Sequence, residues 1–160
     1  AKEGKGEILQ YRHKSADIAT VKNDLLLLRQ MWDKLLIIND YYELSSLCDG
    51  IHIGQEDLVA IDPDPLQAIE KLKTRIGEGK MIGLSTHNAE EIEIANTLNI
   101  DYIGLGAYRA TSTKSEAKVL GEDLDSLAKL SVHPVAAIGG VKLEDTFTYV
   151  TYKVIGSGLL

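Results

Sequence analysis

The sequence predicts an α/β fold with a parallel sheet, and two observations favour a (β/α)8 barrel. Seven short apolar runs alternate with segments that carry the three- and four-residue spacing of buried helix faces. Polar side chains follow nearly every apolar run, as expected where the strands of a barrel end at one rim. A doubly wound open sheet would instead need a glycine-rich phosphate loop after its first strand, where this chain has Arg12, His13 and Lys14.

Length and composition limit the functional classes. The 160 residues suffice for one domain, residues 1–160, with a sizeable core. A net charge of −7 argues against nucleic-acid binding but allows a small anionic ligand at a local basic cluster. Cys48 is the only cysteine, so no intrachain disulfide can form, which fits a cytoplasmic location. No apolar run approaches the roughly 18 residues of a membrane span, so we expect no membrane partner.

The first half of the chain predicts three strands and three helices. The expected strands are Glu7–Arg12, Leu35–Asn39 and Ile51–Gly54. Ser15 or Asp17 can cap a helix that runs to about Trp32. A short helix is expected within Tyr41–Leu47. Asp64 and Pro65 are suited to begin a third helix, which Gly77 or Gly79 would end.

The second half predicts four strands and three helices. The expected strands are Met81–Ser85, Tyr102–Leu105, Val135–Ile138 and Lys153–Ile155. Asn88 and Glu91 have the spacing of a capping box that opens the helix Ala89–Leu98. Asp123 is expected to cap the next helix, and Leu143–Val150 is expected to be helical. The long polar segment 106–121 exceeds an ordinary strand-to-helix loop, which indicates a functional loop.

Seven strands cannot close an eight-stranded barrel without leaving two open edges. We therefore expect one further strand upstream of Ala1 and one further helix beyond Leu160 in the intact protein.

Two carboxylates are expected at neighbouring strand ends. Asp40 follows the second predicted strand and Asp57 follows the third. Parallel strands bring these ends together, and paired carboxylates bind hard divalent cations such as Mg²⁺. Asp57 alone would be interpreted as a helix N-cap, but together with Asp40 it is a predicted metal ligand.

Basic and glycine-rich groups are expected at the same rim. Gln10, Arg12 and Lys14 share one face by the two-residue period of a strand. The long loop adds Lys114 beside two threonines. Arginine and lysine side chains can hold a diphosphate, and backbone N–H groups of the glycine turns at 139–140 and 156–158 can hold a second phosphate.

At this point the chain resembles thiamine-phosphate synthase. The matching segments occur in the family's order: residues 10–14 (QYRHK), 38–40 (IND), 52–57 (HIGQED), 83–88 (GLSTHN), 102–106 (YIGLG), 111–114 (TSTK) and 137–140 (AIGG). The resemblance implies a Mg²⁺-dependent (β/α)8-barrel transferase. It would join an aminopyrimidine diphosphate to a thiazole phosphate, giving thiamine phosphate and pyrophosphate.

The resemblance also implies a role for each matching residue. Asp40 and Asp57 would bind Mg²⁺. The diphosphate would be held by Arg12, Lys14, Asn39, Ser85 and Lys114, of which Arg12, Lys14 and Lys114 would be catalytic through charge stabilisation. Gln10 and His52 would face the pyrimidine. The thiazole phosphate would be bound by Thr111, Thr113, Gly140 and Ser157.

The chain departs from the family pattern in the loop before the Thr-x-Thr-Lys motif, where residues 107–110 (AYRA) replace a proline-containing sequence. The loss of proline would loosen the loop, or Arg109 would add a phosphate contact. Two rival functions stay open at this point. One is a related thiazole tautomerase with His87 as the base, which would need no acid pair. The other is a catalytically silent protein that binds thiamine precursors.

Overall fold

The computed structural model describes residues 7–110 and 119–156. Within these residues, helices separate successive strands except β6 and β7, and hydrogen-bonded neighbours in the seven-stranded sheet follow the order of the chain from β1 to β7. The α/β class is therefore confirmed, whereas closure into an eight-stranded barrel stays a prediction. The chain divides into two compact units, Ala1–Gly83 and Leu84–Leu160, and each is described by itself. Among the described residues, no helix combines the length and apolarity needed to cross a membrane.

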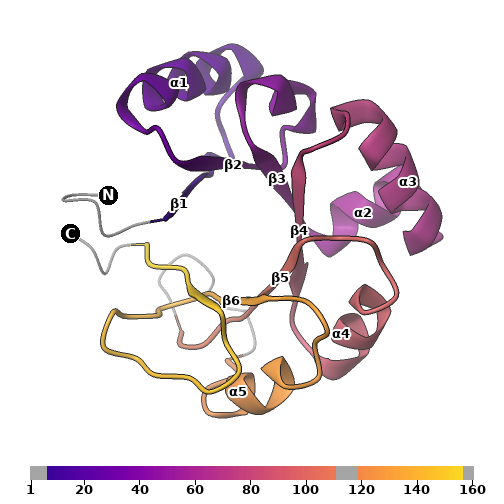
Figure 1. Ribbon diagram of the computed structural model, residues 1–160, viewed down its shortest axis with the longest axis vertical. Helices are drawn as coiled ribbons and strands as arrows, with labels where there is room; N and C mark the ends of the chain where they lie inside the picture. Colours follow the sequence, from indigo (N-terminus) through magenta and orange to yellow (C-terminus); the bar gives the residue numbers. More distant parts are fainter. Residues whose placement is uncertain (1–6, 111–118, 157–160) are drawn as a thin grey trace. The chain divides into compact units, whose positions relative to one another are not determined.

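The first unit contains parallel strands with helices between them, and Figure 1 shows α1 beside β2. Its elements are β1 (Ile8–Tyr11), α1 (Ile18–Met31), β2 (Leu35–Asn39), the 3₁₀ helix η2 (Tyr42–Leu47), β3 (Gly50–Ile53), α2 (Gln55–Ile61), α3 (Pro65–Ile76) and the start of β4 (Met81–Thr86). Strand β2 pairs in parallel with both β1 and β3. The three strands expected in this half are thus confirmed, and no strand end shifts by more than one residue.

Helix α1 begins and packs as its sequence predicts. The Asp17 carboxylate caps the helix by accepting a hydrogen bond from the Thr20 N–H at 2.8 Å. Val21 and Leu25, one turn apart, are fully buried and attach the helix to the sheet. The Trp32 indole N–H donates to the Leu35 carbonyl at 2.9 Å, which fixes the connection from α1 into β2.

Helix α3 also follows its capping signals, whereas α2 was not predicted. Asp64 accepts from the Leu66 N–H at 3.1 Å, Pro65 is the first helical residue, and Gly77 ends the helix with a φ of 85°. Helix α2 covers Gln55–Ile61, where only polar residues after a strand were expected, with a helix cap at Asp57 as the alternative; the cap position is Gly54. The seven residues of α2 are too few for a periodic apolar stripe to be recognised.

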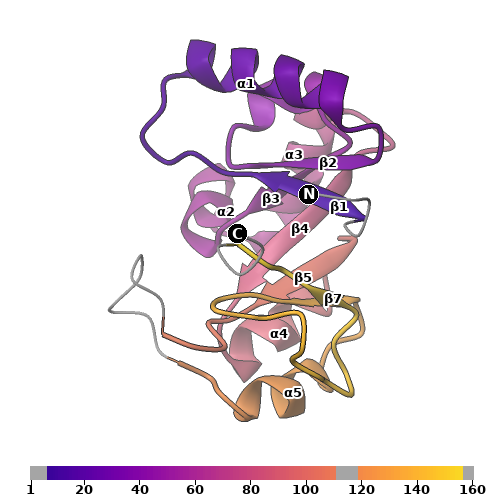
Figure 2. The same cartoon turned by 90° about the vertical axis from the view of Figure 1, so that its left-hand side faces the viewer.

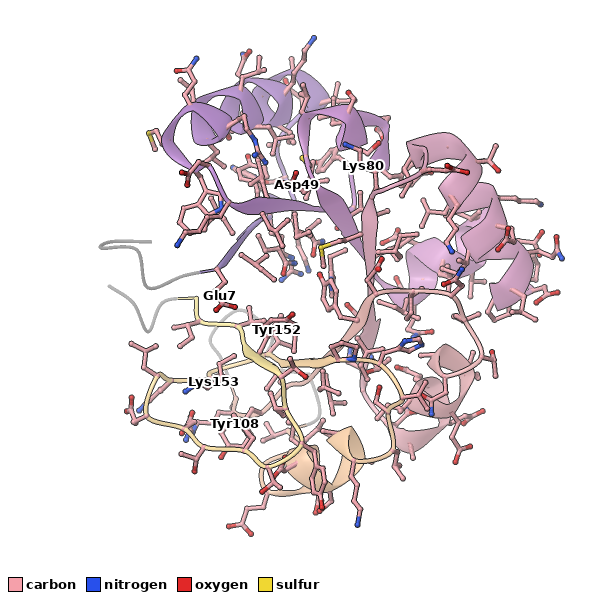
Figure 3. All side chains as sticks on the ribbon, in the orientation of Figure 1. Glu7, Asp49, Lys80, Tyr108, Tyr152 and Lys153 are labelled. Carbon is pink, nitrogen blue, oxygen red and sulfur yellow. The ribbon has the colours of Figure 1, made fainter. Side chains whose placement is uncertain are left out.

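A charged cluster holds the amino ends of β2 and β3. The Asp49 carboxylate accepts from the Leu36 N–H at 2.8 Å and from the Arg29 guanidinium at 2.7 Å. Burial alone would raise the pKa of Asp49, but these hydrogen bonds and the charges of Arg29 and Lys80 outweigh it and lower the pKa. Figure 3 labels Asp49 and Lys80 at this cluster. The charge of Asp49 is therefore balanced by neighbouring cations, and the residue stabilises the start of these strands.

The second unit continues the alternation as far as β6, and Figure 2 shows its elements β5, α5 and β7. Its elements after β4 are α4 (Ala89–Ala95), β5 (Tyr102–Leu105), α5 (Asp123–Ala128), β6 (Val135–Ala137) and β7 (Tyr152–Lys153). Strand β6 pairs in parallel with β5 and β7. Three of the four strands expected in this half are confirmed; the last one, expected over Lys153–Ile155, is the two-residue β7, which begins one residue earlier and ends at Lys153.

The helix caps of this unit are partly as expected. Asn88 caps α4 by accepting from the Glu91 N–H at 2.8 Å. The Glu91 carboxylate accepts a hydrogen bond from the His87 N–H at 2.9 Å. In a standard capping box it would accept from the N–H of the cap residue itself, which here is Asn88. The expected Asp123 cap of α5 is wrong, because Asp123 is already helical and Glu122 occupies the cap position without a side-chain hydrogen bond.

The helix expected over Leu143–Val150 is wrong, because this segment is irregular. Its threonines and aromatic residues are weak helix formers, and side chains elsewhere in the unit bind its backbone. The Asp125 carboxylate accepts from the N–H groups of Thr148 and Tyr149, each at 2.8 Å. The Lys153 ammonium, labelled in Figure 3, donates to the Leu143 carbonyl at 2.5 Å and to the Asp145 carbonyl at 3.1 Å.

We predict that Asp125→Ala loosens this segment. Loss of two charge-assisted hydrogen bonds should lower the free energy of unfolding by about 1–2 kcal/mol, measured by chemical denaturation. Amide hydrogen exchange should accelerate at Thr148 and Tyr149. Ser126→Ala, at the exposed neighbouring position, is the control and should leave both measurements unchanged. Equal effects of the two substitutions would show that Asp125 does not hold the segment.

Candidate active site

The two predicted metal ligands lie together in the first unit. Asp40 directly follows β2, and Asp57 lies in the first turn of α2, directly after β3. Because β2 and β3 are parallel neighbours, their carboxyl ends are adjacent, and the Asp40 and Asp57 carboxyl groups lie within hydrogen-bonding reach of each other. The expectation that these acids meet at neighbouring strand ends is confirmed; metal binding by them stays a prediction.

Asp40 adopts a backbone conformation that favours glycine. Its φ is 73°, in the left-handed region, and no other described residue except glycine has a positive φ. The Asp40 N–H donates to the His52 carbonyl at 3.0 Å, which ties this turn to β3. Such a conformation costs free energy and persists only where the surrounding structure maintains it. Glycine would adopt this backbone conformation at a lower cost in free energy, so we infer that the carboxylate of Asp40 has a role that glycine could not fill.

The charges of the pair are in conflict. Desolvation by the surrounding protein, the negative charge of Asp40 and the hydrogen bond with Asp40 raise the pKa of Asp57 above its ordinary value. Glu56 adds a smaller repulsion. Unlike Asp49, the pair has no ion-pair contact with a lysine or arginine among the described side chains. A divalent cation would relieve this repulsion directly.

A chain of amide hydrogen bonds supports Asp40. The Gln10 Nε2 group donates to Asn39 Oδ1 at 2.9 Å, and Asn39 Nδ2 donates to the Asp40 carboxylate at 2.6 Å. The chain links β1 to the end of β2 and fixes which Asp40 oxygen faces Asn39. A carboxylate has about four lone-pair sites, so Asp40 keeps acceptor capacity beyond its bond with Asn39.

Strand register places three predicted site residues on one face of the sheet. Gln10 pairs with Ile37, two residues before Asn39, and Asn39 pairs with His52. Alternate residues of a strand share a face, and paired residues of parallel neighbours point the same way. Gln10, Asn39 and His52 therefore line the same face, and His52 is buried there with 4% of its surface exposed.

The predicted continuation of this face through Arg12 and Lys14 is wrong. Strand β1 ends at Tyr11, and Lys14 lies in a turn, so the two-residue period does not extend to these positions. Both side chains are exposed on the loop between β1 and α1. They can still reach an anion from this loop, since each carries a long flexible stem.

The acid pair has a ligand set that suits Mg²⁺. No group of three or more histidine, cysteine, aspartate or glutamate side chains with metal-binding geometry occurs in the described part of the chain. Two carboxylates are the usual protein ligands of Mg²⁺, which keeps several waters and takes further oxygens from a bound phosphate. The site thus fits a cation that arrives with, or is completed by, a phosphorylated substrate.

In the second unit, the predicted phosphate turn is packed against the loop after β5. Gly139 and Gly140 have φ values of 91° and 64°. A Cβ atom on Gly139 would lie 2.7 Å from the Ala107 Cβ, and one on Gly140 would lie 2.8 Å from the Arg109 Cβ. The Arg109 N–H donates to the Gly139 carbonyl at 2.9 Å, so the turn and the loop support each other.

Arg109 has a partner within the protein. Its guanidinium binds the Asp145 carboxylate through two nitrogens, at 2.6 and 2.7 Å, and donates to the Gly140 carbonyl at 2.8 Å. The hydrogen bond from Arg109 lowers the pKa of Asp145 to about 2. These bonds hold residues 107–109 in place, against the expectation of a loosened loop, whereas a phosphate contact of Arg109 stays a prediction. Arg109 fixes residues 107–109 to the glycine turn, and it stacks on the Tyr108 ring at 4.6 Å.

The remaining predicted residues are distributed as follows. Ser85 lies in β4 and Gly140 in the glycine turn, both in the second unit. Thr111, Thr113, Lys114 and Ser157 lie outside the described residues. His87, the alternative base, is exposed and its Nδ1 lies 3.0 Å from the Glu91 carboxylate.

Sequence reasoning missed two residues that organise these regions. Asp145 was placed in an expected helix, and nothing in its local sequence predicts its pairing with Arg109, 36 positions away. Tyr41 received no role, yet its hydroxyl donates to the Ala16 carbonyl at 2.7 Å and reaches the loop that carries Arg12 and Lys14.

The comparisons with known proteins agree with one another. The family model for thiamine monophosphate synthase matches residues 1–157. The thiamine-phosphate synthase of Persephonella marina is 35% identical over 86% of this chain and 65% of its own length. The one from Lawsonia intracellularis is 32% identical over 84% of this chain and 61% of its own length, so the chain spans less than two thirds of these relatives.

A solved structure gives the same result. The thiamine phosphate pyrophosphorylase from Pyrococcus furiosus aligns with a TM-score of 0.69 at 28% identity, covering 85% of this chain and 63% of that protein. A match over nearly all residues, relatives at or above 30% identity and a similar fold all point the same way. This chain belongs to the thiamine monophosphate synthase family.

Proposed function

We propose that the full-length protein is a thiamine-phosphate synthase, which joins an aminopyrimidine diphosphate to a thiazole phosphate and releases pyrophosphate. The observation that carries this proposal is the contact between the Asp40 and Asp57 carboxyls at the ends of β2 and β3. A pair of acids with no ion pair to a lysine or arginine among the described side chains suits a metal that accompanies a diphosphate. The names of the relatives, all thiamine-phosphate synthases, support the same reaction.

Mg²⁺ is the cation that these residues fit best. Asp40 and Asp57 would hold it, with waters and diphosphate oxygens as the other ligands. When bound, the ion would supply positive charge to the leaving diphosphate. The amide chain from Gln10 through Asn39 would keep the Asp40 carboxylate in place during this contact.

The roles of the other predicted residues are proposed from the resemblance to the family, and the structure supports some of them. Gln10 and His52 share a face with Asn39, which supports the proposal that they line the pyrimidine site. Arg12 and Lys14 would approach the diphosphate from their exposed loop. The remaining proposed substrate contacts are Ser85, Thr111, Thr113, Lys114, Gly140 and Ser157.

The reaction needs charge stabilisation and alignment more than acid–base catalysis. The bond between the pyrimidine methylene carbon and the diphosphate oxygen breaks, and its electron pair leaves with pyrophosphate. The thiazole nitrogen then supplies the electron pair of the new carbon–nitrogen bond. The electron-rich pyrimidine ring favours early departure of the leaving group, so basic side chains and a cation around the diphosphate accelerate the step. No side-chain nucleophile takes part.

The two rival functions lack this support. A tautomerase needs a base but no acid pair, and His87 is engaged by Glu91. A silent binding protein would gain nothing from two acids in mutual repulsion. The synthase therefore accounts for the structure better than either rival.

We predict that the full-length protein releases pyrophosphate only when both substrates and Mg²⁺ are present. A coupled pyrophosphate assay measures this directly, with each substrate alone as a control. Isomerisation of the thiazole substrate without pyrophosphate release would favour the tautomerase, and binding without any conversion would favour the silent protein.

We also predict that Asp40→Asn lowers kcat/KM by about 100-fold or more at limiting Mg²⁺, because one charged ligand of the cation is lost. Circular dichroism should show an unchanged fold. Glu56→Gln is the matched control, since Glu56 is the exposed acid beside Asp57 and has no proposed contact with the metal. Activity of Asp40→Asn near that of Glu56→Gln at low Mg²⁺ would contradict the metal assignment.

A further inference from the structure

We propose that Tyr41 is a positioning residue for the diphosphate: it fixes the loop that carries Arg12 and Lys14 to the turn that carries Asp40. This inference rests on the proposed function, because it assigns a role to the loop in binding the diphosphate. Tyr41 itself is not proposed to touch the substrate.

The contacts of Tyr41 bridge two segments that are far apart in the sequence. Its hydroxyl donates to the Ala16 carbonyl at 2.7 Å and lies 3.4 Å from the His13 carbonyl. Both carbonyls belong to the loop between β1 and α1. The two basic side chains flank His13 on this loop, so the bond from Tyr41 acts on the part of the backbone that carries them.

The backbone of Tyr41 is fixed by the same turn that positions Asp40, the predicted metal ligand. Asp40 has its left-handed φ of 73°, and its N–H is bonded to the His52 carbonyl. The Tyr41 N–H then donates back to the Asn39 carbonyl at 3.1 Å. One tight turn therefore orients the Asp40 carboxylate and the Tyr41 ring together.

Other contacts hold the two ends of the loop, and the Tyr41 hydroxyl contacts two carbonyls between them, at His13 and, more closely, at Ala16 next to the helix cap. The loop begins where β1 ends at Tyr11, and it finishes at Asp17, which caps α1 through the Thr20 N–H. A loop without regular hydrogen bonds loses conformational entropy when it closes on a ligand. Fixing it beforehand improves affinity by removing part of that cost.

The mutation that tests this idea removes a single oxygen atom. Tyr41→Phe keeps the ring and deletes the hydroxyl that bonds to Ala16. Tyr42→Phe is a matched control one residue away, because the Tyr42 hydroxyl accepts from Arg75 on α3 at 3.2 Å and does not reach the loop. The two variants change the same chemical group at adjacent positions.

The measurement is binding of Mg²⁺-pyrophosphate to the full-length protein by calorimetry, together with steady-state kinetics. For Tyr41→Phe we expect about five-fold weaker pyrophosphate binding, which is the effect of one hydrogen bond. KM for the pyrimidine diphosphate should rise similarly, with kcat and KM for the thiazole phosphate nearly unchanged. Tyr42→Phe should match the wild type, and amide exchange at residues 15–17 should accelerate only in Tyr41→Phe.

The outcomes separate this inference from the function on which it rests. Wild-type protein that does not bind Mg²⁺-pyrophosphate would overturn both. Wild-type binding with equal affinities of Tyr41→Phe and Tyr42→Phe would overturn the role of Tyr41 and leave the proposed function standing. A loss confined to kcat in Tyr41→Phe would also overturn it, because a positioning role for the diphosphate loop must appear in binding.

Discussion

Two carboxylates held next to each other repel, and the parallel pairing of β2 with β3 imposes this arrangement on Asp40 and Asp57. The surrounding contacts keep the two carboxylates together and do not reduce the repulsion between them. Asn39 fixes the Asp40 carboxylate, the His52 carbonyl holds the turn, and α2 carries Asp57 in its first turn. A site that keeps such a conflict is suited to a cation supplied with the substrate.

In the first unit, the acid pair and the structural aspartate lie at opposite ends of β2 and β3. At the amino ends of β2 and β3, Asp49 is neutralised by Arg29 and by the Leu36 N–H. At the carboxyl ends, the acid pair has no such ion pair among the described side chains. This division is the one expected of strands whose carboxyl ends carry the chemistry while their amino ends contribute stability. The same chain thus uses aspartate in two ways that differ only in the neighbours provided.

Much of the fold could be predicted from local sequence, because its signals are local. Asp17 and Asp64 cap their helices as expected, and the apolar runs form the expected strands. The failures depend on contacts between distant residues. The segment 143–150 is irregular because side chains from α5 and β7 bind its backbone, and α2 is too short to show a period.

The site divides in the same way. Asp40 and Asp57 could be placed together from strand order alone, since neighbouring parallel strands end side by side. The extension of the strand face to Lys14 failed because β1 ends at Tyr11. The contact of Tyr41 with the basic loop could not be foreseen, because it depends on a positive φ at a non-glycine residue.

The measurement that tests the central claim most directly is a crystal structure of the full-length protein with pyrophosphate and Mn²⁺, which replaces Mg²⁺ and can be located by its anomalous scattering. The account predicts one metal ion bound to an oxygen of Asp40 and an oxygen of Asp57, each at about 2.1 Å, and to the pyrophosphate. Pyrophosphate bound with its metal ion away from both aspartates would contradict it.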